Sequence, residues 1–202
     1  MTDTIVILAN SAKHGEHCVA GKSLTTREWV QLVGNAEGSA LSREQASMTN
    51  HIPGDWLVKP LQKIVMNIGP AVPLRHQPEN YICEPGWVQN YSIRLPELPA
   101  YLDTPNSIWG PAPRLSEDEI ASGADIEQSL YLVKVEDMEL YKPDAARSRV
   151  TFRYNGIEYD LPSTCTDFNK ILKGEKAHDN YVVVSLGENH KGYHYKIIAT
   201  IL

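Results

Sequence analysis

The dipeptide Asn155-Gly156 constrains this chain more than any other feature, because it fixes the turn and the register of one hairpin. A two-residue type I′ turn needs positive φ at both central positions, and Asn-Gly is the pair that adopts it most readily. The flanking runs, residues 150–154 and 157–161, then pair so that apolar side chains meet on one face and opposite charges on the other. The predicted partners are Tyr154 with Ile157, Arg153 with Glu158, Phe152 with Tyr159 and Val150 with Leu161.

Further strand-like runs place this hairpin inside a five-stranded unit. Apolar runs with the composition of strands occupy residues 129–135, 181–186 and 193–202. Before the fourth strand, residues 166–174 predict a short helix, with late lysines and Gly174 just after its end. Three strands, a helix and two strands is the order of an OB barrel, a small fold that binds oligonucleotides and oligosaccharides. An SH3-like barrel is the alternative.

The first half of the chain repeats this pattern less regularly. Strand-like runs occupy residues 4–9, 17–20, 29–33 and 63–68. Ser42 and Gln45 have the spacing of a capping box, which predicts a short helix to about Met48. We therefore predict a mainly β protein with a few short helices, in which two OB-like small β-barrels pack as one compact unit.

The region between the two predicted barrels differs from both in composition. Five of the chain's 13 prolines lie between Pro96 and Pro113 without a repeat, which indicates an ordered connection rather than a flexible linker. The acidic segment after it predicts a brief helix that is capped by Ser116 and ends near Gly123. The predicted boundaries are residues 1–110 for the first barrel with its proline-rich extension, 111–127 for an acidic connector and 128–202 for the second barrel.

Composition excludes several classes of function. The 202 residues include 25 acidic and 19 basic side chains, and the net charge of -6 argues against bulk electrostatic binding to duplex DNA. No apolar run approaches the ~20 residues of a membrane span, and the N-terminus lacks the basic region of a secretory signal. The three widely spaced cysteines, Cys18, Cys83 and Cys165, fit reduced thiols. We expect a cytoplasmic protein that does not bind membranes.

The familiar catalytic motifs are missing from the sequence. It contains no GxGxxG, GxxxxGK[ST], GxSxG, HExxH or paired CxxC, which argues against dinucleotide, P-loop, hydrolase-elbow and zinc-finger chemistry. His14, His17 and Cys18 resemble part of a metal site, but no fourth ligand accompanies them. We therefore predict neither a cofactor nor a metal.

The first candidate binding site is a polar run at residues 10–22, the N-terminal cluster. It falls between two predicted strands, in the class of loop with which OB barrels bind ligands. Its cations suit phosphate, and its other polar side chains suit a base or a sugar. The candidates are Asn10, Ser11, Lys13, His14 and Lys22. The alternative is a solvated hairpin loop whose polar residues serve turn geometry.

The second candidate site is the middle cluster, residues 75–81. Donors, acceptors and an aromatic ring surround Pro78, which fixes one turn. The candidate ligand contacts are His76, Gln77 and Asn80. A buried bend whose polar side chains satisfy backbone groups is the alternative.

The third candidate site is the C-terminal cluster, residues 185–196, which connects the fourth and fifth strands of the second barrel. In OB barrels this connection and the one between the first two strands frame the oligonucleotide face. Lys191 and Lys196 are candidates for phosphate contacts and Tyr193 for base stacking. The connection between the first two strands adds Tyr141, Lys142, Arg147 and Arg149.

Alternation along the last strand separates two rows of side chains in this cluster. Tyr193 and Tyr195 fall on one face, and His194 and Lys196 fall on the other. We expect the tyrosine row to lie in the core. His190 and His194 do not indicate a metal site, because a glycine between them favours a turn.

The chain resembles the prokaryotic family called the dual OB-containing domain, over most of its length except about residues 34–56 and 110–127. The segments that carry the resemblance are IVILANSAKHGEHCVAGK, LRHQPENYI, FRYNGIEYDLP and VVVSLGENHKGYHYKIIATI. The family implies two OB-like barrels in one compact unit and an association with bacterial conflict or phage-defence systems. Nucleic-acid or nucleotide recognition is implied mainly by the fold, and no catalytic residues carry over. After the tryptophan that corresponds to Trp29, relatives tend to have an arginine and a proline, where this chain has Gln31 and Leu32.

These observations support three hypotheses about function. We favour a non-catalytic recognition module that binds single-stranded nucleic acid or a nucleotide at the N-terminal and C-terminal clusters. The second hypothesis is an enzyme that acts on a nucleotide or nucleic acid, with His14 or His194 as general base and Glu188 or Glu16 as its orienting partner. The third is a scaffold that binds a protein partner.

Overall fold

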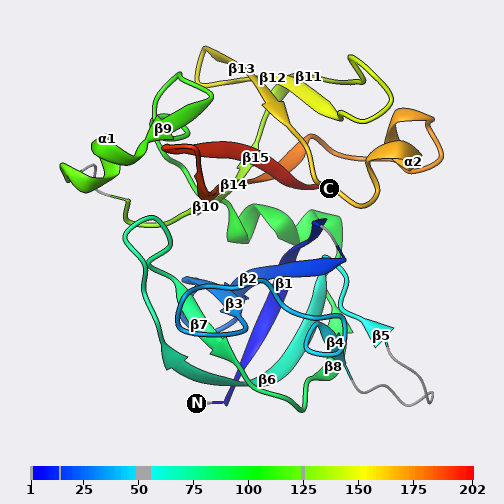
Figure 1. The fold of residues 1–202 in the computed structure, drawn as a ribbon. Coiled ribbons are helices and arrows are strands. Elements are labelled where there is room, and N and C mark those ends of the chain that lie inside the picture. The colour runs from blue at the N-terminus through cyan, green and yellow to red at the C-terminus, as the bar shows by residue number, and fades with distance from the viewer. Residues whose placement is uncertain (1, 14, 49–55, 124–125) are drawn as a thin grey trace. The chain divides into compact units, whose positions relative to one another are not determined.

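The structure is a computed structural model that describes residues 2–13, 15–48, 56–123 and 126–202. The chain divides into two compact units, Met1–Tyr101 and Leu102–Leu202. Both units are mainly β, as predicted; Figure 1 shows the first in blue to green and the second in green to red. Within the described residues, no helix is long and apolar enough to cross a membrane.

The first unit contains a closed five-stranded barrel. Its strands are β1 (Thr2–Lys13), β2 (Glu16–Ser23), β3 (Trp29–Val33), β6 (Gln62–Ala71) and β7 (Asn80–Cys83). They pair in the order β1-β2-β3-β7-β6, and β6 also pairs with β1, which closes the ring. Only the pairing of β3 with β7 is parallel among these described strands. The arrangement is that of an OB barrel, as predicted.

Four smaller elements accompany this barrel. A short hairpin is formed by β4 (Ser47–Met48) and β5 (Trp56–Leu57), and β8 (Val88–Ser92) pairs with β6. The chain then forms a 3-10 helix, η1 (Leu95–Tyr101), inside the proline-rich stretch. The sequence predicted order in that stretch but not this helix.

The short helix predicted to start at Ser42 is wrong, although its capping box forms. The Ser42 side chain accepts from the Gln45 amide at 3.2 Å, and the Gln45 side chain accepts from the Ser42 amide at 2.9 Å. One turn closes, with the Ala46 amide donating to the Ser42 carbonyl at 3.0 Å. Ser47 then pairs with Leu57 in β4 and β5. Because the residues from Ser47 onward pair as a strand, the single turn that begins at Ser42 does not extend into a helix.

A close approach between β1 and β2 explains one glycine of the first barrel. Gly21 pairs with Ile7, and a Cβ atom at Gly21 would lie 2.2 Å from the Val6 carbonyl oxygen. Because that oxygen belongs to the backbone of a paired strand, the position requires glycine. Apolar side chains fill the barrel beside it, including Ile5, Val19, Leu32, Ile64 and Trp87.

The second unit has the predicted order of three strands, a helix and two strands. Its strands are β10 (Leu130–Lys134), β11 (Glu136–Tyr141), β12 (Arg149–Tyr154), β13 (Ile157–Pro162), β14 (Tyr181–His190) and β15 (Tyr193–Ile201), with α2 (Phe168–Leu172) between β13 and β14. The first predicted strand continues as β11, so β10 and β11 together occupy its place.

Two sheets make the barrel of the second unit. Their orders are β10-β14-β15-β9 and β11-β12-β13, where β9 is Arg114–Ser116. A parallel bridge from Ser163 to Ile198 joins them, and the Ser163 hydroxyl donates to the Ile198 carbonyl at 3.1 Å. The result is a partly open barrel, which is typical of OB folds.

The acidic segment supplies β9 and α1 (Glu117–Ala121) to the second unit. The predicted capped helix is confirmed, because Ser116 is its N-cap and the capping box with Glu119 is complete. The domain boundaries at residues 110 and 127 stay a prediction.

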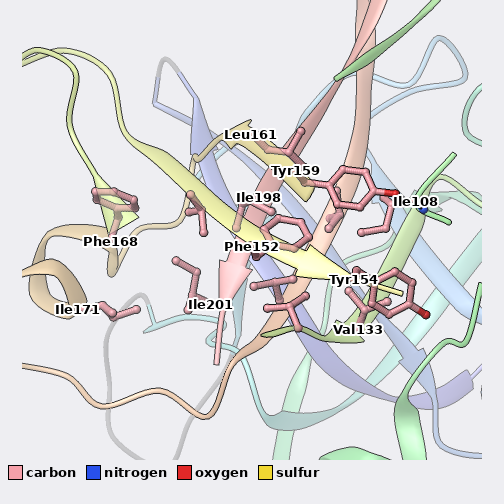
Figure 2. Packing of buried hydrophobic residues seen from close by; sticks show 14 residues of the cluster. Ile108, Val133, Phe152, Tyr154, Tyr159, Leu161, Phe168, Ile171, Ile198 and Ile201 are labelled. Atoms are coloured by element: carbon pink, nitrogen blue, oxygen red, sulfur yellow. Dashed lines mark hydrogen bonds between the residues drawn. The ribbon is translucent and has the colours of Figure 1, made fainter. Parts of the chain in front are cut away.

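The hairpin at Asn155-Gly156 forms as the sequence predicts. Both turn residues have positive φ, 48° and 76°, and all four predicted pairs are in register. Its inner face packs into the core of the second unit, where the rings of Phe152 and Tyr159 stack with centroids 5.3 Å apart. Figure 2 shows these rings beside Ile198 of β15.

The proline-rich segment that enters the second unit is tied to this hairpin. The Asn155 side chain donates to the carbonyls of Pro105 at 3.1 Å and Asn106 at 3.3 Å. The Tyr154 hydroxyl donates to the Pro105 carbonyl at 2.9 Å, and Ile108 is fully buried in the core. The segment is therefore part of the barrel's packing.

Candidate functional site

The C-terminal cluster forms one long hairpin rather than a loop. β14 runs to His190 and β15 starts at Tyr193, so only Lys191 and Gly192 make the turn. Both turn residues have positive φ, 54° and 82°. Lys191 is exposed at the end of this hairpin.

The outer face of the hairpin end carries an aromatic and cationic group of side chains. The Arg114 guanidinium lies 3.7 Å from the centroid of the Tyr193 ring and 5.6 Å from that of Tyr195. Arg114 also donates to the Tyr195 hydroxyl at 2.9 Å, and His190 lies 6.4 Å from the Tyr195 ring. We name Arg114, His190, Lys191, Tyr193 and Tyr195 the hairpin-end site.

Arg114 comes to this site through β9. This strand pairs with β15, so that Arg114 is opposite Tyr195 and Ser116 is opposite Tyr193. Sequence reasoning missed Arg114 as a site residue. Its strand partner is 81 positions away, and no local motif marks Arg114 as a binding residue.

The alternation predicted for β15 is confirmed, but the expected inner face is wrong. Tyr193 and Tyr195 are half-buried on the outer face, whereas His194 and Lys196 are buried. The polar side chains can face inward because each finds hydrogen-bond partners there. The tyrosine rings are therefore left at the surface of the hairpin end.

His194 is enclosed by acceptors. Its Nδ1 lies 2.8 Å from the Gly187 carbonyl and its Nε2 lies 2.8 Å from the Glu117 carboxylate. The side chain is 1% exposed. Both ring nitrogens are engaged, so the ring is not placed to take a proton from a substrate. Its carboxylate partner is Glu117, whereas Glu188, the predicted orienting residue, is exposed.

Lys196 is buried without a carboxylate partner among the described residues. Its ammonium donates to the Gly110 carbonyl at 2.6 Å and lies 5.6 Å from the centroid of the Tyr159 ring. The Tyr159 hydroxyl donates to the same carbonyl at 3.3 Å. Burial lowers the pKa of Lys196 to about 8. This position does not bring Lys196 to phosphate.

The N-terminal cluster is also a hairpin, because β1 reaches Lys13 and β2 begins at Glu16. The loop expected there is wrong, and most of its polar residues are strand residues. Asn10, Ser11 and Lys22 are buried. His14 lies outside the described residues, and so does the side chain of Lys13.

The buried polar side chains of this cluster contact the protein itself. Asn10 donates to the Val58 carbonyl at 2.7 Å, and its amide oxygen lies 2.9 Å from Nδ1 of His17. Burial and, to a smaller extent, the nearby Arg43 charge lower the pKa of His17. The Lys22 ammonium lies 5.2 Å from the centroid of a ring of Trp29.

The middle cluster forms a tight turn with a buried base. Leu74 and Gln77 exchange backbone hydrogen bonds at 3.0 Å. Gln77 and Asn80 are buried, and the Asn80 amide donates to the Gln77 side chain at 3.3 Å. His76 is half-buried. The cluster lies in the first unit and the hairpin-end site in the second.

On the outer face of the sheet formed by β11, β12 and β13, the arginines are ion-paired with carboxylates, unlike Arg114 at the hairpin-end site. Arg149 pairs with Asp160 at 2.8 Å, and Arg153 pairs with Glu136 at 3.2 Å and with Asp137. The Tyr141 hydroxyl also donates to Asp160, and Arg147 pairs with Asp144. The two predicted arginines, Arg147 and Arg149, are therefore neutralised by carboxylates, whereas Lys142 is exposed.

The described part of the chain contains no cluster of three or more His, Cys, Asp or Glu side chains that could hold a metal ion. His190 and His194 lie on opposite faces of the hairpin end: His190 is exposed beside Tyr195, and His194 is buried.

The fold defines a protein built from OB-type barrels, and the comparison with family models gives the family. The model described as "Dual OB-containing domain" matches residues 3–201. This chain therefore belongs to the dual OB-containing domain family, as its resemblance predicted.

The other comparisons add no argument about function. Among solved structures, the chain is similar to one described as the crystal structure of the tetrameric p202 HIN2, with 8% identity and a TM-score of 0.32. The match covers 100% of this chain and 93% of that chain. A TM-score this low supports no conclusion about either fold or function. No curated protein matches the chain.

Proposed function

We propose that this protein is a non-catalytic recognition module that binds a short single-stranded nucleic acid, or a free nucleotide, at the hairpin-end site. The observation that carries the proposal is the set of contacts made by the Arg114 guanidinium. Among the described residues its guanidinium contacts two tyrosines and no carboxylate. The other three arginines of the second unit, Arg147, Arg149 and Arg153, are all ion-paired.

The chemistry of the site matches that of single-strand recognition. Bases stack on tyrosine rings and on the planes of guanidinium groups, and such stacking contributes ~1–3 kcal/mol per base. Arg114 lies against Tyr193 and is exposed, so its plane extends the aromatic surface toward solvent. Lys191 at the turn adds a cation for phosphate.

Charges beside the site favour a ligand of one or two nucleotides. The exposed acids Asp118 and Glu119 come soon after β9, and Glu188 is exposed on β14. A longer phosphate chain leaving the site would meet these carboxylates. The net charge of -6 agrees with local rather than extended binding.

The binding of a labelled oligonucleotide tests the proposal. A ten-nucleotide oligothymidylate with fluorescein at its 3′ end is titrated with the protein at low salt, and fluorescence anisotropy reports the affinity. We expect Arg114→Ala to weaken binding about tenfold, since it removes one stacking surface and one cation. Arg153→Ala is the matched control and leaves the affinity unchanged, because Arg153 is occupied by carboxylates.

The length of the ligand is tested by competition. A 5′-phosphorylated thymidine dinucleotide displaces the whole labelled signal if the site takes one or two nucleotides. The proposal is overturned if neither probe binds, or if Arg114→Ala and Arg153→Ala weaken binding equally. The bacterial defence association implied by the family resemblance remains a proposal about the setting in which such a module acts.

A further inference from the structure

The segment that carries Arg114 is held to the hairpin by one carboxylate. Glu117 is the first residue of α1, and its backbone amide donates to the Gly192 carbonyl at 2.9 Å. Its carboxylate oxygen Oε2 lies 2.8 Å from Nε2 of His194. The same oxygen accepts a hydrogen bond from the side-chain amide of Asn189. Glu117 therefore contacts both strands and the turn of the hairpin.

The hydrogen bonds around this carboxylate define which groups donate. The Gly192 amide donates to Oδ1 of Asn189 at 3.0 Å, so the NH₂ group of Asn189 points to Glu117. On the other side of His194, Nδ1 faces the Gly187 carbonyl, which only accepts. Both ring nitrogens of His194 therefore face acceptor oxygens, one from the backbone and one from the Glu117 carboxylate.

Strand β9, which connects Glu117 to Arg114, is too short to be stable by its own pairing. β9 has three residues, Arg114–Ser116, and it is the edge strand of its sheet. Strands of three residues gain little from pairing alone. Arg114 is exposed at the far end of β9 from Glu117. The contacts of Glu117 fix the near end and thereby limit where the guanidinium lies over Tyr193.

We propose, resting on the proposed function, that Glu117 and His194 are positioning residues for the hairpin-end site. Their pair, in which the His194 ring is buried, holds β9 against β15, and this keeps Arg114 against Tyr193 before a ligand arrives. Neither residue contacts the ligand. Their contribution to affinity passes through Arg114, because a preorganised guanidinium loses less freedom on binding.

A double-mutant cycle tests this assignment on the full chain. Affinity for the labelled oligothymidylate is measured for Glu117→Ala, Arg114→Ala and the double variant. We expect Glu117→Ala alone to weaken binding about fivefold, and to have no further effect once Arg114 is alanine. A role that is only structural lowers the melting temperature in both backgrounds but does not produce this coupling in affinity.

Two further variants separate positioning from loss of folding. Glu117→Gln restores most of the affinity, because its amide oxygen can still accept from the side-chain amide of Asn189 and face Nε2 of His194. Glu139→Ala is the matched control: it removes an exposed carboxylate of β11 and leaves the affinity unchanged. Melting temperatures of all variants show whether the unit stays folded.

The outcomes distinguish this inference from the proposed function. If Arg114→Ala weakens binding and Glu117→Ala does not, the positioning role is overturned while the proposed function stands. If Glu117→Ala weakens binding by the same factor in both backgrounds, Glu117 acts independently of Arg114 and the positioning role is again overturned. If Arg114→Ala has no effect on binding, the proposed function itself fails.

Discussion

The sheet face of β11–β13 and the end of the β14–β15 hairpin both carry cationic side chains, but these side chains have different partners in the two regions. On the sheet face, Arg149 and Arg153 lie against carboxylates at 2.8 and 3.2 Å. At the hairpin, Arg114 lies against tyrosine rings and Lys196 against a backbone carbonyl. The sheet face corresponds to the usual ligand face of OB barrels, yet its arginines are already neutralised.

Residue type alone therefore does not indicate a phosphate site. A guanidinium that shares a carboxylate must give up that partner before it can bind an anion, and the exchange gains little. A guanidinium stacked on a tyrosine keeps its charge and most of its donors for a ligand.

The strongest effect is predicted for Lys196, the buried lysine of β15. Its pKa is about 8 in the folded protein against 10.5 for an ordinary lysine. Between these values the unfolded chain holds the proton and the folded chain does not, so the free energy of unfolding rises with pH. Relative to Lys196→Met, the native protein should gain about 3 kcal/mol between pH 8 and pH 10.5.

Urea unfolding of both proteins across this pH range measures the gain. Tyrosines and other lysines titrate in both proteins, so they cancel in the difference. The difference is constant below pH 8, where both states hold the proton, and constant again above pH 10.5. A difference that stays flat from pH 8 to pH 10.5 shows that the Lys196 ammonium is solvated in the folded state.

An intermediate effect is expected from removing the carboxylates that occupy Arg153. Glu136→Gln together with Asp137→Asn leaves its guanidinium available on an exposed face. We expect affinity for the labelled oligothymidylate to rise about threefold at low salt. Stability falls only slightly, since these pairs are solvent-exposed. Anisotropy titration and thermal melting measure the two effects.

The control for this gain removes the same charge without freeing an arginine. Glu28→Gln with Glu44→Gln neutralises two exposed acids of the first unit. If this control raises the affinity as much as Glu136→Gln with Asp137→Asn, net charge explains the gain. In that case the contrast between the two faces is not what limits binding at Arg153.

The smallest effect concerns Lys191 at the turn. Lys191→Asn removes its cation and keeps a residue that tolerates the positive φ of 54°. We expect affinity to fall about twofold at low salt, and the slope of log affinity against log salt to decrease by about 0.7 for one lost phosphate contact. Lys142→Asn, at another exposed lysine of the second unit, should leave the slope unchanged. An unchanged slope for Lys191→Asn excludes its phosphate contact.

The fold was predictable where local sequence contained the information. The Asn155-Gly156 turn and the alternation beside it determine the register without reference to the rest of the chain. The order of strands around α2 followed from the same kind of pattern. The helix expected from Ser42 failed because Ser47 pairs with Leu57, and that competition does not appear in the capping sequence.

The candidate site was less predictable, because its contacts join distant segments. Alternation separated Tyr195 from Lys196, but hydrophobicity suggested the wrong inner face. The buried position of Lys196 depends on the Gly110 carbonyl, 86 positions away. Arg114 reaches the Tyr195 hydroxyl across 81 positions. A single sequence contains no signal for pairings of this kind.

The turn residue Asn155 is constrained both by its backbone conformation and by the hydrogen bonds of its side chain. Its backbone takes a φ of 48° for the type I′ turn, and its side-chain amide donates to the carbonyls of Pro105 and Asn106. Aspartate would keep the turn but has no N–H to donate, and glycine would keep the turn but has no side chain. Glutamine could donate but does not readily adopt this φ. Few substitutions are therefore tolerable at this position, although its side chain is exposed.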